Sequence, residues 1–401
     1  MYGAKNSPFT FSFSIEAIRE VEIMTTYKIV LIPGDGIGPE VIAEGVKVLE
    51  SAGEIFGINF DWHEYPYGAE YYLKTGVLLP DEDLKEWEKW ANAIYLGAIG
   101  HPKVDDTLSL HGILLKIRFY FDQYVNLRPI KLLKGVFSPL MGKNSEDINF
   151  IVIRENTEDF YVGLGGEGTK GKNKAELNLW RRLFKVKFNL DIETNAEEIA
   201  YQIGLVSKEG CERVFEYSFK LAKKLGRKKV TSVDKINAMG YIYGYWRSKF
   251  LEIGEKYPEI EKETIFADAA AMWFVKAPEK FDVVVTPNFI GDILTDLGAA
   301  ISGGMGFAAG ANINPEGISM FEPIHGSAPK YKGKNIANPI ATIWSGALML
   351  DHLGHHDAYK AILKAIETVL SERKVVPKDL GGDSKTGEIG DAIVEELKEM
   401  F

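Results

Sequence analysis

Two carboxylates and their spacing give the clearest chemical signal in the sequence. Asp292 and Asp296 lie four positions apart in residues 291–297, which open an apolar helical pattern. A helix would place both on one face, where like charges repel by roughly a few tenths of a kcal/mol, so the pair predicts a compensating cation. Hard oxygen ligands favour Mg²⁺ or Mn²⁺ over zinc. Asp268, at another apolar helix start, could complete a set of three carboxylates. Taken singly, these aspartates also fit a solvated helix face or an N-cap.

Three arginines supply the opposite charge. Arg128 and Arg154 close apolar, strand-like segments, and Arg118 lies ten residues before the first of these. A guanidinium at the end of a buried strand can fork onto a carboxylate or phosphate. Together with the aspartates, the arginines predict a site for a small acid that carries several charges. Each arginine alone also fits a structural ion pair.

Tyr161 and Lys235 both stand near predicted strand ends. A phenol and an amine close to a metal ion and guanidinium groups would have lowered pKa values, which suits proton transfer near neutral pH. Neither residue is diagnostic by itself, because tyrosines usually pack and lysines are usually solvated.

The elements that must position these side chains alternate between strand and helix. Short apolar runs, several of them followed by helical patterns such as residues 40–52, predict buried parallel strands and an α/β architecture. These runs are residues 27–32, 93–96, 150–153, 229–233 and 281–286. The loop at residues 34–38 reads G-x-G-x-G and lacks the last glycine of a dinucleotide fingerprint, which favours a tight turn over a Rossmann pyrophosphate site.

A different pattern marks the middle of the chain. Residues 163–178 are rich in glycine and lysine, and residues 183–190 alternate apolar with polar as a half-exposed strand does. An exposed pair of strands suits a clasp between two subunits.

Composition limits the class of protein. The 401 residues predict two domains or lobes, and 46% hydrophobic with 26% charged residues indicates a globular chain. The net charge of -10 offers no basic field for nucleic acid, and no apolar run is long enough to cross a membrane. Cys211 is the only cysteine, which excludes an intrachain disulfide and suggests a cytoplasmic setting. Residues 1–23 are interpreted as an extension, with Met24 as a candidate start and an extra edge strand as the alternative.

With these residues assembled, the chain resembles the β-decarboxylating dehydrogenases of isocitrate, 3-isopropylmalate, homoisocitrate, D-malate and tartrate. The resemblance runs from about Lys28 to the C-terminus. It is closest to the D-malate and tartrate branch, through FDQYVNLRP, ANINPE and IANPIATIWSGALMLDHLG. The other motifs are IPGDGIGPE, IRENTEDFY, VDKINAM, FDVVVTPNFIGDILTD and FEPIHGSAP.

The resemblance implies a two-lobed isopropylmalate dehydrogenase-like α/β fold, not a Rossmann fold, with a β-strand dimer clasp. Residues 24–123 and 303–401 would form a discontinuous cofactor-binding lobe, and residues 124–302 the substrate, metal and dimerisation lobe. A homodimer with shared active sites is implied, and a higher oligomer stays open. Arg118, Arg128 and Arg154 would hold the malate moiety. Asp292 and Asp296, with Asp268 of the second subunit, would hold the metal. Tyr161 and, from the second subunit, Lys235 would be the acid and base groups.

Substrate choice in this family depends on the helix before Arg118. Gly112 and Leu114 stand where isocitrate enzymes carry a polar Ser and Asn pair, which disfavours isocitrate. Leu114 and Leu115 would make an apolar pocket for hydrogen, a methyl or an isopropyl group, while His111 departs from both related groups. D-malate or tartrate is therefore expected, with 3-isopropylmalate as the leading alternative, ahead of homoisocitrate and isocitrate. A non-catalytic regulatory subunit is disfavoured, because the proton-transfer residues and metal carboxylates are all present.

The resemblance also implies that NAD or NADP lies on the loop from His325 to Asn338. NAD-dependent relatives generally carry an Asp and an apolar residue where this chain has Lys330 and Tyr331. An ammonium cannot accept hydrogen bonds from ribose hydroxyls but can meet the extra phosphate of NADP. Against NADP, Ala337 fits the NAD pattern, and Pro377 and Gly381 replace a Tyr and an Arg of NADP-dependent relatives. On the strength of Lys330 and Tyr331, NADP is still expected, with NAD left open. The alternative is that Lys330 is a solvated loop residue. The implied cofactor residues are His325, Gly326, Ser327, Ala328, Lys330, Tyr331 and Asn338.

Overall fold

The computed structural model describes residues 25–401. The expected extension at residues 1–23 and the candidate start Met24 lie outside this range. The strands are β1 (Thr25–Gly34), β2 (Ile58–Glu64), β3 (Ala93–Ala98), β4 (Val125–Lys131), β5 (Asn149–Glu155), β6 (Asp159–Trp180), β7 (Lys185–Leu205), β8 (Lys229–Asp234), β9 (Glu261–Phe266), β10 (Val283–Thr286), β11 (Ala309–Ile313) and β12 (Ser319–Pro323).

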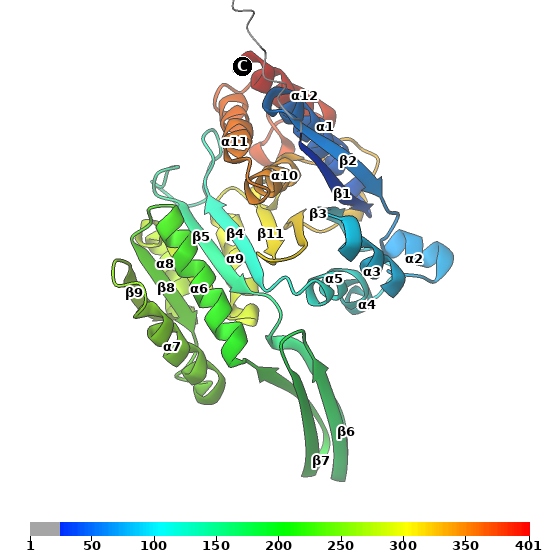
Figure 1. Cartoon of the computed structure of the whole chain (residues 1–401), viewed down its shortest axis with the longest axis vertical. Coiled ribbons are helices and arrows are strands. Elements are labelled where there is room, and N and C mark those ends of the chain that lie inside the picture. The colour runs from blue at the N-terminus through cyan, green and yellow to red at the C-terminus, as the bar shows by residue number, and fades with distance from the viewer. Residues whose placement is uncertain (1–24) are drawn as a thin grey trace, which may run out of the picture.

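Helices pack around these strands, which confirms the α/β class (Figure 1). The α-helices are α1 (Gly38–Phe56), α2 (Ala69–Thr75), α3 (Asp81–Trp90), α4 (Asp106–Ser109), α5 (Leu115–Tyr120), α6 (Lys208–Lys224), α7 (Gly240–Gly254), α8 (Ala267–Lys276), α9 (Asn288–Ile301), α10 (Ile340–His352), α11 (His356–Ser371) and α12 (Thr386–Glu399). Short 3₁₀ or π turns are η1 (Leu110–Leu114), η2 (Pro278–Lys280), η3 (Met305–Phe307), η4 (Pro329–Tyr331) and η5 (Lys378–Leu380).

One sheet of ten strands runs through the molecule in the order β2-β1-β3-β12-β11-β4-β5-β10-β8-β9. The strands β2, β1, β3 and β12 are parallel to one another, and so are β5, β10, β8 and β9. The antiparallel strands β11 and β4 join these two halves at the centre. Strands from both ends of the chain therefore meet in one half, because β3 pairs with β12.

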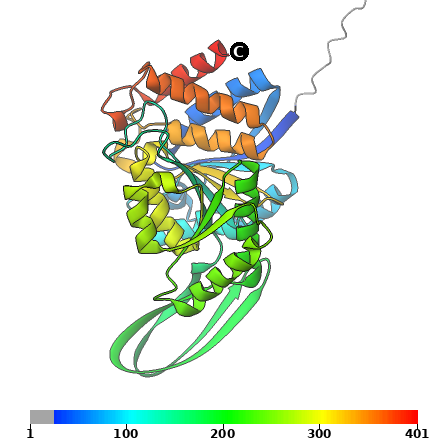
Figure 2. The same ribbon diagram turned by 90° about the vertical axis from the view of Figure 1, so that its left-hand side faces the viewer.

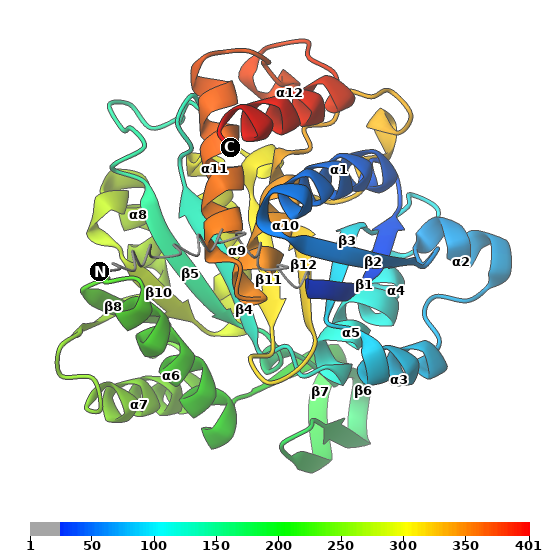
Figure 3. The same ribbon diagram turned by 45° about the horizontal axis from the view of Figure 1, so that its top comes forward.

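Alternation along the buried strands assigns helices to the two faces of the first half. In β1, Ile29 and Leu31 belong to the core packed by α1, α10, α11 and α12, whereas Val30 and Ile32 belong to a second core with Leu84 of α3. Figure 3 looks onto the first of these helical layers. Parallel strands buried on both faces explain the continuous apolar runs in the sequence.

A long hairpin projects from the second half of the sheet (Figure 2). The strands β6 and β7 pair only with each other, from Asp159 opposite Leu205 to Trp180 opposite Lys185. The expected exposed strand pair is therefore present, and it is longer than residues 163–190. A small apolar cluster of Val162, Leu164 and Leu179 forms its own core.

The five strands expected from the sequence are all present, although β10 begins at Val283. The lobe boundaries 24–123 plus 303–401 and 124–302 stay a prediction, because the sheet is continuous across them. Within residues 25–401, no helix is both long and apolar enough to span a bilayer.

Candidate active site

Buried arginines meet at the centre of the sheet. Arg128 on β4 and Arg154 on β5 occupy neighbouring antiparallel strands, with Arg128 opposite Val152 and Arg154 opposite Asn126. Asn126, the residue opposite Arg154, lies two positions from Arg128 on β4, and positions two residues apart share a face. Both guanidinium groups therefore lie on the same side of the sheet, which is called the front face here. Their exposed fractions are 6% and 2%, and Arg118 of α5 is 6% exposed.

Helix α9 brings both predicted aspartates to these arginines. It follows β10, which is parallel to its neighbour β5. Its first turns therefore lie at the carboxyl ends of these strands, close to Arg154 near the end of β5. Arg154 Nη1 donates a short hydrogen bond to Asp292 Oδ1. Arg128 Nη1 lies 3.3 Å from Asp296 Oδ1, and Arg128 Nη2 lies 3.9 Å from Asp292 Oδ1.

Burial and charge pull the pKa values of these groups in different directions. Burial, followed by the neighbouring Arg154 guanidinium, lowers the pKa of Arg128 to about 10, and burial also lowers that of Arg154. Burial tends to raise the pKa of Asp292, yet Arg154 and the Tyr161 hydrogen bond bring it below the usual value. Burial keeps the pKa of Asp296 above its usual value. Asp292 is therefore the firmly ionised partner of the arginines.

Tyr161, near the start of β6, joins the same group. Its hydroxyl donates to Asp292 Oδ2 at 2.6 Å, and the Arg154 guanidinium lies 5.0 Å from its ring centroid. Burial and the hydrogen bond to Asp292 raise the pKa of Tyr161 to about 12. The expectation that its pKa is lowered is wrong for the protein groups on their own, because burial and the Asp292 carboxylate together outweigh the Arg154 guanidinium.

Lys235 and Asp268 form a separate pair. They follow β8 and β9, adjacent parallel strands that end together, and Lys235 Nζ donates to Asp268 Oδ1 at 2.5 Å. That hydrogen bond lowers the pKa of Asp268. Asp268 is the second residue of α8, whose N-cap is Phe266, so the N-cap interpretation is wrong.

Within one chain this pair does not complete the aspartate site. Among residues 25–401, no hydrogen bond or ion pair connects Lys235 or Asp268 with Asp292, Asp296 or Tyr161. The same part of the chain holds no group of three His, Cys, Asp or Glu side chains placed to bind a metal ion.

A hollow of about 120 Å³ connects the predicted substrate and cofactor residues. Leu114, Arg118 and Arg128 line it together with His325 and Gly326. Leu115 is 2% exposed and is not part of its wall, whereas His111 lies exposed on the η1 turn. The apolar contribution to this hollow from the helix before Arg118 therefore comes from Leu114.

Several polar residues that hold the arginines were not predicted from the sequence. Arg118 Nη2 donates to Glu322 Oε1 at 2.9 Å. Arg128 Nε donates to Asn126 Oδ1 at 2.8 Å, and Arg154 Nε to Asn288 Oδ1 at 2.9 Å. Asn126 could have been found by alternation along β4, but Glu322 lies some 200 positions from its arginine and carries no local signal.

The glycine loop after β1 supports the predicted cofactor loop. Gly34 and Gly36 have φ values of 76° and 61°, which confirms the tight-turn interpretation. A Cβ on Gly36 would lie 2.0 Å from the carbonyl oxygen of Ser327, and that oxygen accepts a hydrogen bond from Ile37 N. The loop thus packs directly against the backbone of residues 325–328, where Ala328 has a φ of 38°.

Two ammonium groups flank Tyr331 on that cofactor loop. Lys330 Nζ lies 4.9 Å and Lys378 Nζ 5.1 Å from its ring centroid, and Lys330 is exposed. Asn338 is buried and its amide donates to Asp379 at 3.0 Å, which ties the loop to η5. Lys378 has no local signal in the sequence, since only the folded chain brings η5 beside Tyr331.

The chain is similar to known proteins over most of its length. The family model described as isocitrate/isopropylmalate dehydrogenase matches residues 28–393. The chain is 44% identical to "3-isopropylmalate dehydrogenase" of Thermobifida fusca (strain YX), covering 94% of this chain and 99% of that protein. It is 43% identical to "D-malate dehydrogenase [decarboxylating]" of Escherichia coli (strain K12), covering 92% and 98% respectively.

A solved structure is similar to the chain in its fold. The crystal structure of isocitrate dehydrogenase from Methylococcus capsulatus superposes with a TM-score of 0.79 at 35% identity, covering 93% of this chain and 99% of that one. The match over nearly the whole chain and the front-face residues lead to one conclusion: the chain belongs to the isocitrate/isopropylmalate dehydrogenase family and is an oxidoreductase of the decarboxylating dehydrogenase type.

Proposed function

We propose that the protein catalyses the oxidative decarboxylation of a small 2-hydroxy diacid of the D-malate or tartrate type, with Mg²⁺ or Mn²⁺ and NAD(P). The observation that carries this proposal is the convergence of buried Arg128 and Arg154 on Asp292, beside Tyr161. The adjoining hollow reaches from these arginines to His325. Guanidinium groups bind the carboxylates of such an acid, and the hollow leads to the predicted nucleotide loop.

The donor set fits a hard divalent cation. The side chains of Asp292 and Asp296 are 40% and 53% exposed, so solvent reaches both side chains. Asp268, at 68% side-chain exposure, points outward from its own chain. Three carboxylates from two copies of the chain would make an all-oxygen site suited to Mg²⁺ or Mn²⁺.

The residues of the chain then have separate tasks. Arg118, Arg128 and Arg154 orient the carboxylates of the substrate. A bound cation would supply Lewis-acid stabilisation of negative charge on the substrate oxygen, and a bound NAD(P) would supply the hydride acceptor for C2. Lys235 of a second copy moves the hydroxyl proton away. After CO₂ leaves the β-keto acid, the Tyr161 hydroxyl donates a proton to carbon.

A homodimer is part of the proposal, because Lys235 and Asp268 lie apart from Asp292 within one chain. The surfaces beside these groups are unusually apolar for a free face: Met272 on α8 is 49% exposed and Ile293 on α9 is 59% exposed. The hairpin adds Trp180 and Leu183, at 66% and 45%. A second copy that covers α8, α9 and the hairpin would bury this area and bring Lys235 to the neighbouring site.

The substrate assignment rests on the wall of the hollow. Leu114 presents an apolar surface beside Arg118, where isocitrate would need polar partners for its third carboxylate. Leu114 equally suits the isopropyl group of 3-isopropylmalate, which is therefore the second candidate.

NADP is the proposed preferred nucleotide, with NAD as an additional one. Lys330 and Lys378 beside Tyr331 place two cations where an extra phosphate would be met. A cytoplasmic location also belongs to the proposal, since Cys211 is a buried free thiol.

Removing one carboxylate tests the metal site. Asp292→Asn should abolish turnover and also the rise in thermal unfolding midpoint that Mn²⁺ gives the wild type, because a ligand that binds only the folded state stabilises it. Asp391→Asn, on the exposed side of α12, is the control and should keep both. Wild-type turnover that persists in chelator would refute the metal requirement.

A substrate panel tests the diacid. D-malate or tartrate should give the highest kcat/KM among D-malate, tartrate, 3-isopropylmalate, homoisocitrate and isocitrate, because Leu114 offers no polar partner to a third carboxylate. A tenfold lead of 3-isopropylmalate, about 1.4 kcal/mol, would overturn the assignment in favour of the second candidate.

Exchanging the charge at Lys330 tests the nucleotide. Lys330→Asp should shift the preference from NADP toward NAD at least tenfold, because a carboxylate repels the phosphate and accepts ribose hydroxyls. Lys378→Ala should weaken only NADP, and Lys332→Ala, whose ammonium is held by Glu70, is the control on the same loop. A wild-type enzyme tenfold better with NAD would show that Lys330 does not contact a phosphate.

A further inference from the structure

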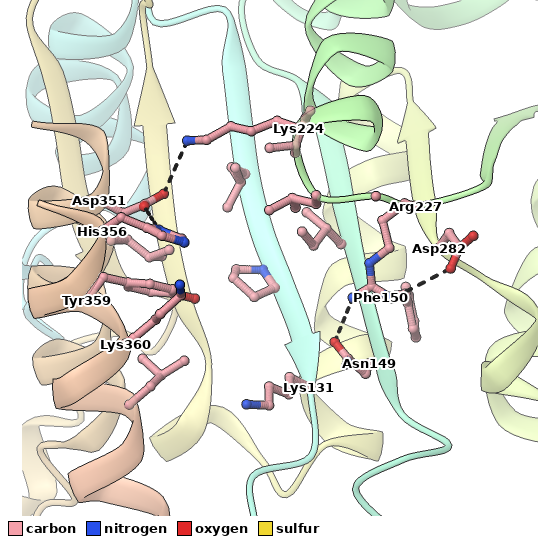
Figure 4. Close-up of a pocket in the computed structure, with 18 of the residues that line it drawn as sticks. Lys131, Asn149, Phe150, Lys224, Arg227, Asp282, Asp351, His356, Tyr359 and Lys360 are labelled. Atoms are coloured by element: carbon pink, nitrogen blue, oxygen red, sulfur yellow. Dashed lines mark hydrogen bonds and ion pairs between the residues drawn. The ribbon is translucent and has the colours of Figure 1, made fainter. Parts of the chain in front are cut away.

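We propose that a groove on the opposite face of the sheet from Arg128 is a second ligand site, for a small phosphorylated molecule with an apolar body. The groove encloses about 700 Å³ between α10 and α11 on one side and the end of α6 on the other (Figure 4). Strands β4 and β5 form its floor. It shares Leu127 and Leu221 with a further hollow of about 340 Å³, which extends it toward β11.

Alternation along β4 separates this groove from the active site. Leu127, Pro129 and Lys131 line the groove, whereas Arg128 between them faces Asp296 on the front. None of the residues that hold Arg118 or Arg154 takes part in the groove. The two sites therefore lie back to back on one strand.

The floor is apolar. Leu127, Pro129 and Ile151 from the strands face Leu348 of α10 and Leu363 of α11 across the groove. A surface of this kind, wide enough for a drug-sized molecule, favours the flat or apolar part of a ligand.

The rim has more positive than negative charge. Six lysine or arginine residues line the groove against three acidic residues, in a chain whose net charge is -10. Each acid already has a basic partner, as Figure 4 shows for two of them. The pairs are Asp351 with Lys224 at 4.0 Å, Glu367 with Lys131 at 2.8 Å, and Asp282 with Arg227 at 3.6 Å.

Three lysines remain without such a partner. In the part of the chain that the structure describes, the ammonium groups of Lys228, Lys360 and Lys364 make no hydrogen bond or ion pair. Lys360 and Lys364 stand four positions apart on α11, so they share one face and repel each other. Lys228 lies on the facing wall, after α6. An anion between the walls would relieve the repulsion on α11 and meet cations from both sides.

A nucleoside monophosphate has both required parts, a dianionic phosphate for the lysines and a flat base for the apolar floor. AMP is therefore a suitable probe. The helices α10 and α11 pack on one half of the sheet and α6 packs on the other. A ligand that bridges them would therefore link the half that holds Glu322, the partner of Arg118, with the half that holds Arg154. Binding is measurable without turnover, so it stands or falls independently of the proposed reaction.

The experiment is calorimetric titration of AMP into the full-length protein, with dinucleotide cofactor saturating so that AMP is excluded from the loop at residues 325–338. The wild type should bind one AMP per chain. The double variant Lys360→Glu, Lys364→Glu should bind it at least tenfold more weakly. The matched control is Lys85→Glu, Lys89→Glu, a pair with the same spacing on the exposed side of α3, which should bind AMP as the wild type does.

Further measurements make the result specific. The α11 variant should keep the wild-type thermal unfolding midpoint and kcat, which shows that it folds. Adenosine and inorganic phosphate should each bind at least tenfold more weakly than AMP, since each lacks one of the two parts. The proposal is overturned if the wild type binds no AMP, if the α11 variant or inorganic phosphate binds as tightly as the wild type binds AMP, or if the α3 control loses binding too.

Discussion

The burial of two like charges side by side is the constraint on which the front of this molecule depends. Arg128 and Arg154 lie on adjacent strands and are almost wholly removed from water, which lowers the pKa of both guanidinium groups. Uncompensated charges in such a place would cost several kcal/mol. Asp292 and Asp296 supply the balance from one helix, and Asn126 and Asn288 accept hydrogen bonds from the two Nε–H groups.

That balance accounts for the placement of the other groups. Tyr161 is held by the same carboxylate that holds Arg154, so its position follows from the charge pairing. Arg118 has its own buried partner, Glu322, from a strand near the other end of the sequence. The antiparallel strands at the centre of the sheet thus bring together residues from both halves. On the front face these residues form the proposed substrate site, and on the back face they form the groove with unpaired lysines.

The sequence predicted what depends on local spacing and missed what depends on distant contacts. The spacing of Asp292 and Asp296 correctly predicted one helical face, and apolar runs predicted five strands. Strands β2 and β9 were missed because they are edge strands with charged residues, and β11 because AGANI has small side chains. The partner of Arg118 and the second cation beside Tyr331 required the folded chain. For the protein groups alone, the lowered pKa expected for Tyr161 was wrong, because its burial and its hydrogen bond to Asp292 leave no local signal in the sequence.

In the proposed dimer each active site is built from two copies of the chain, and mixing two inactive variants tests this most directly. Lys235→Met and Asp292→Asn, dissociated together and reassociated, should regain roughly a quarter of wild-type turnover, because half of a random mixture is heterodimer and each heterodimer has one intact site. Each variant treated alone should stay inactive. A mixture that remains as inactive as its components, although hybrid dimers are detected by native mass spectrometry, would place Lys235 and Asp292 in the same subunit's site and contradict the account.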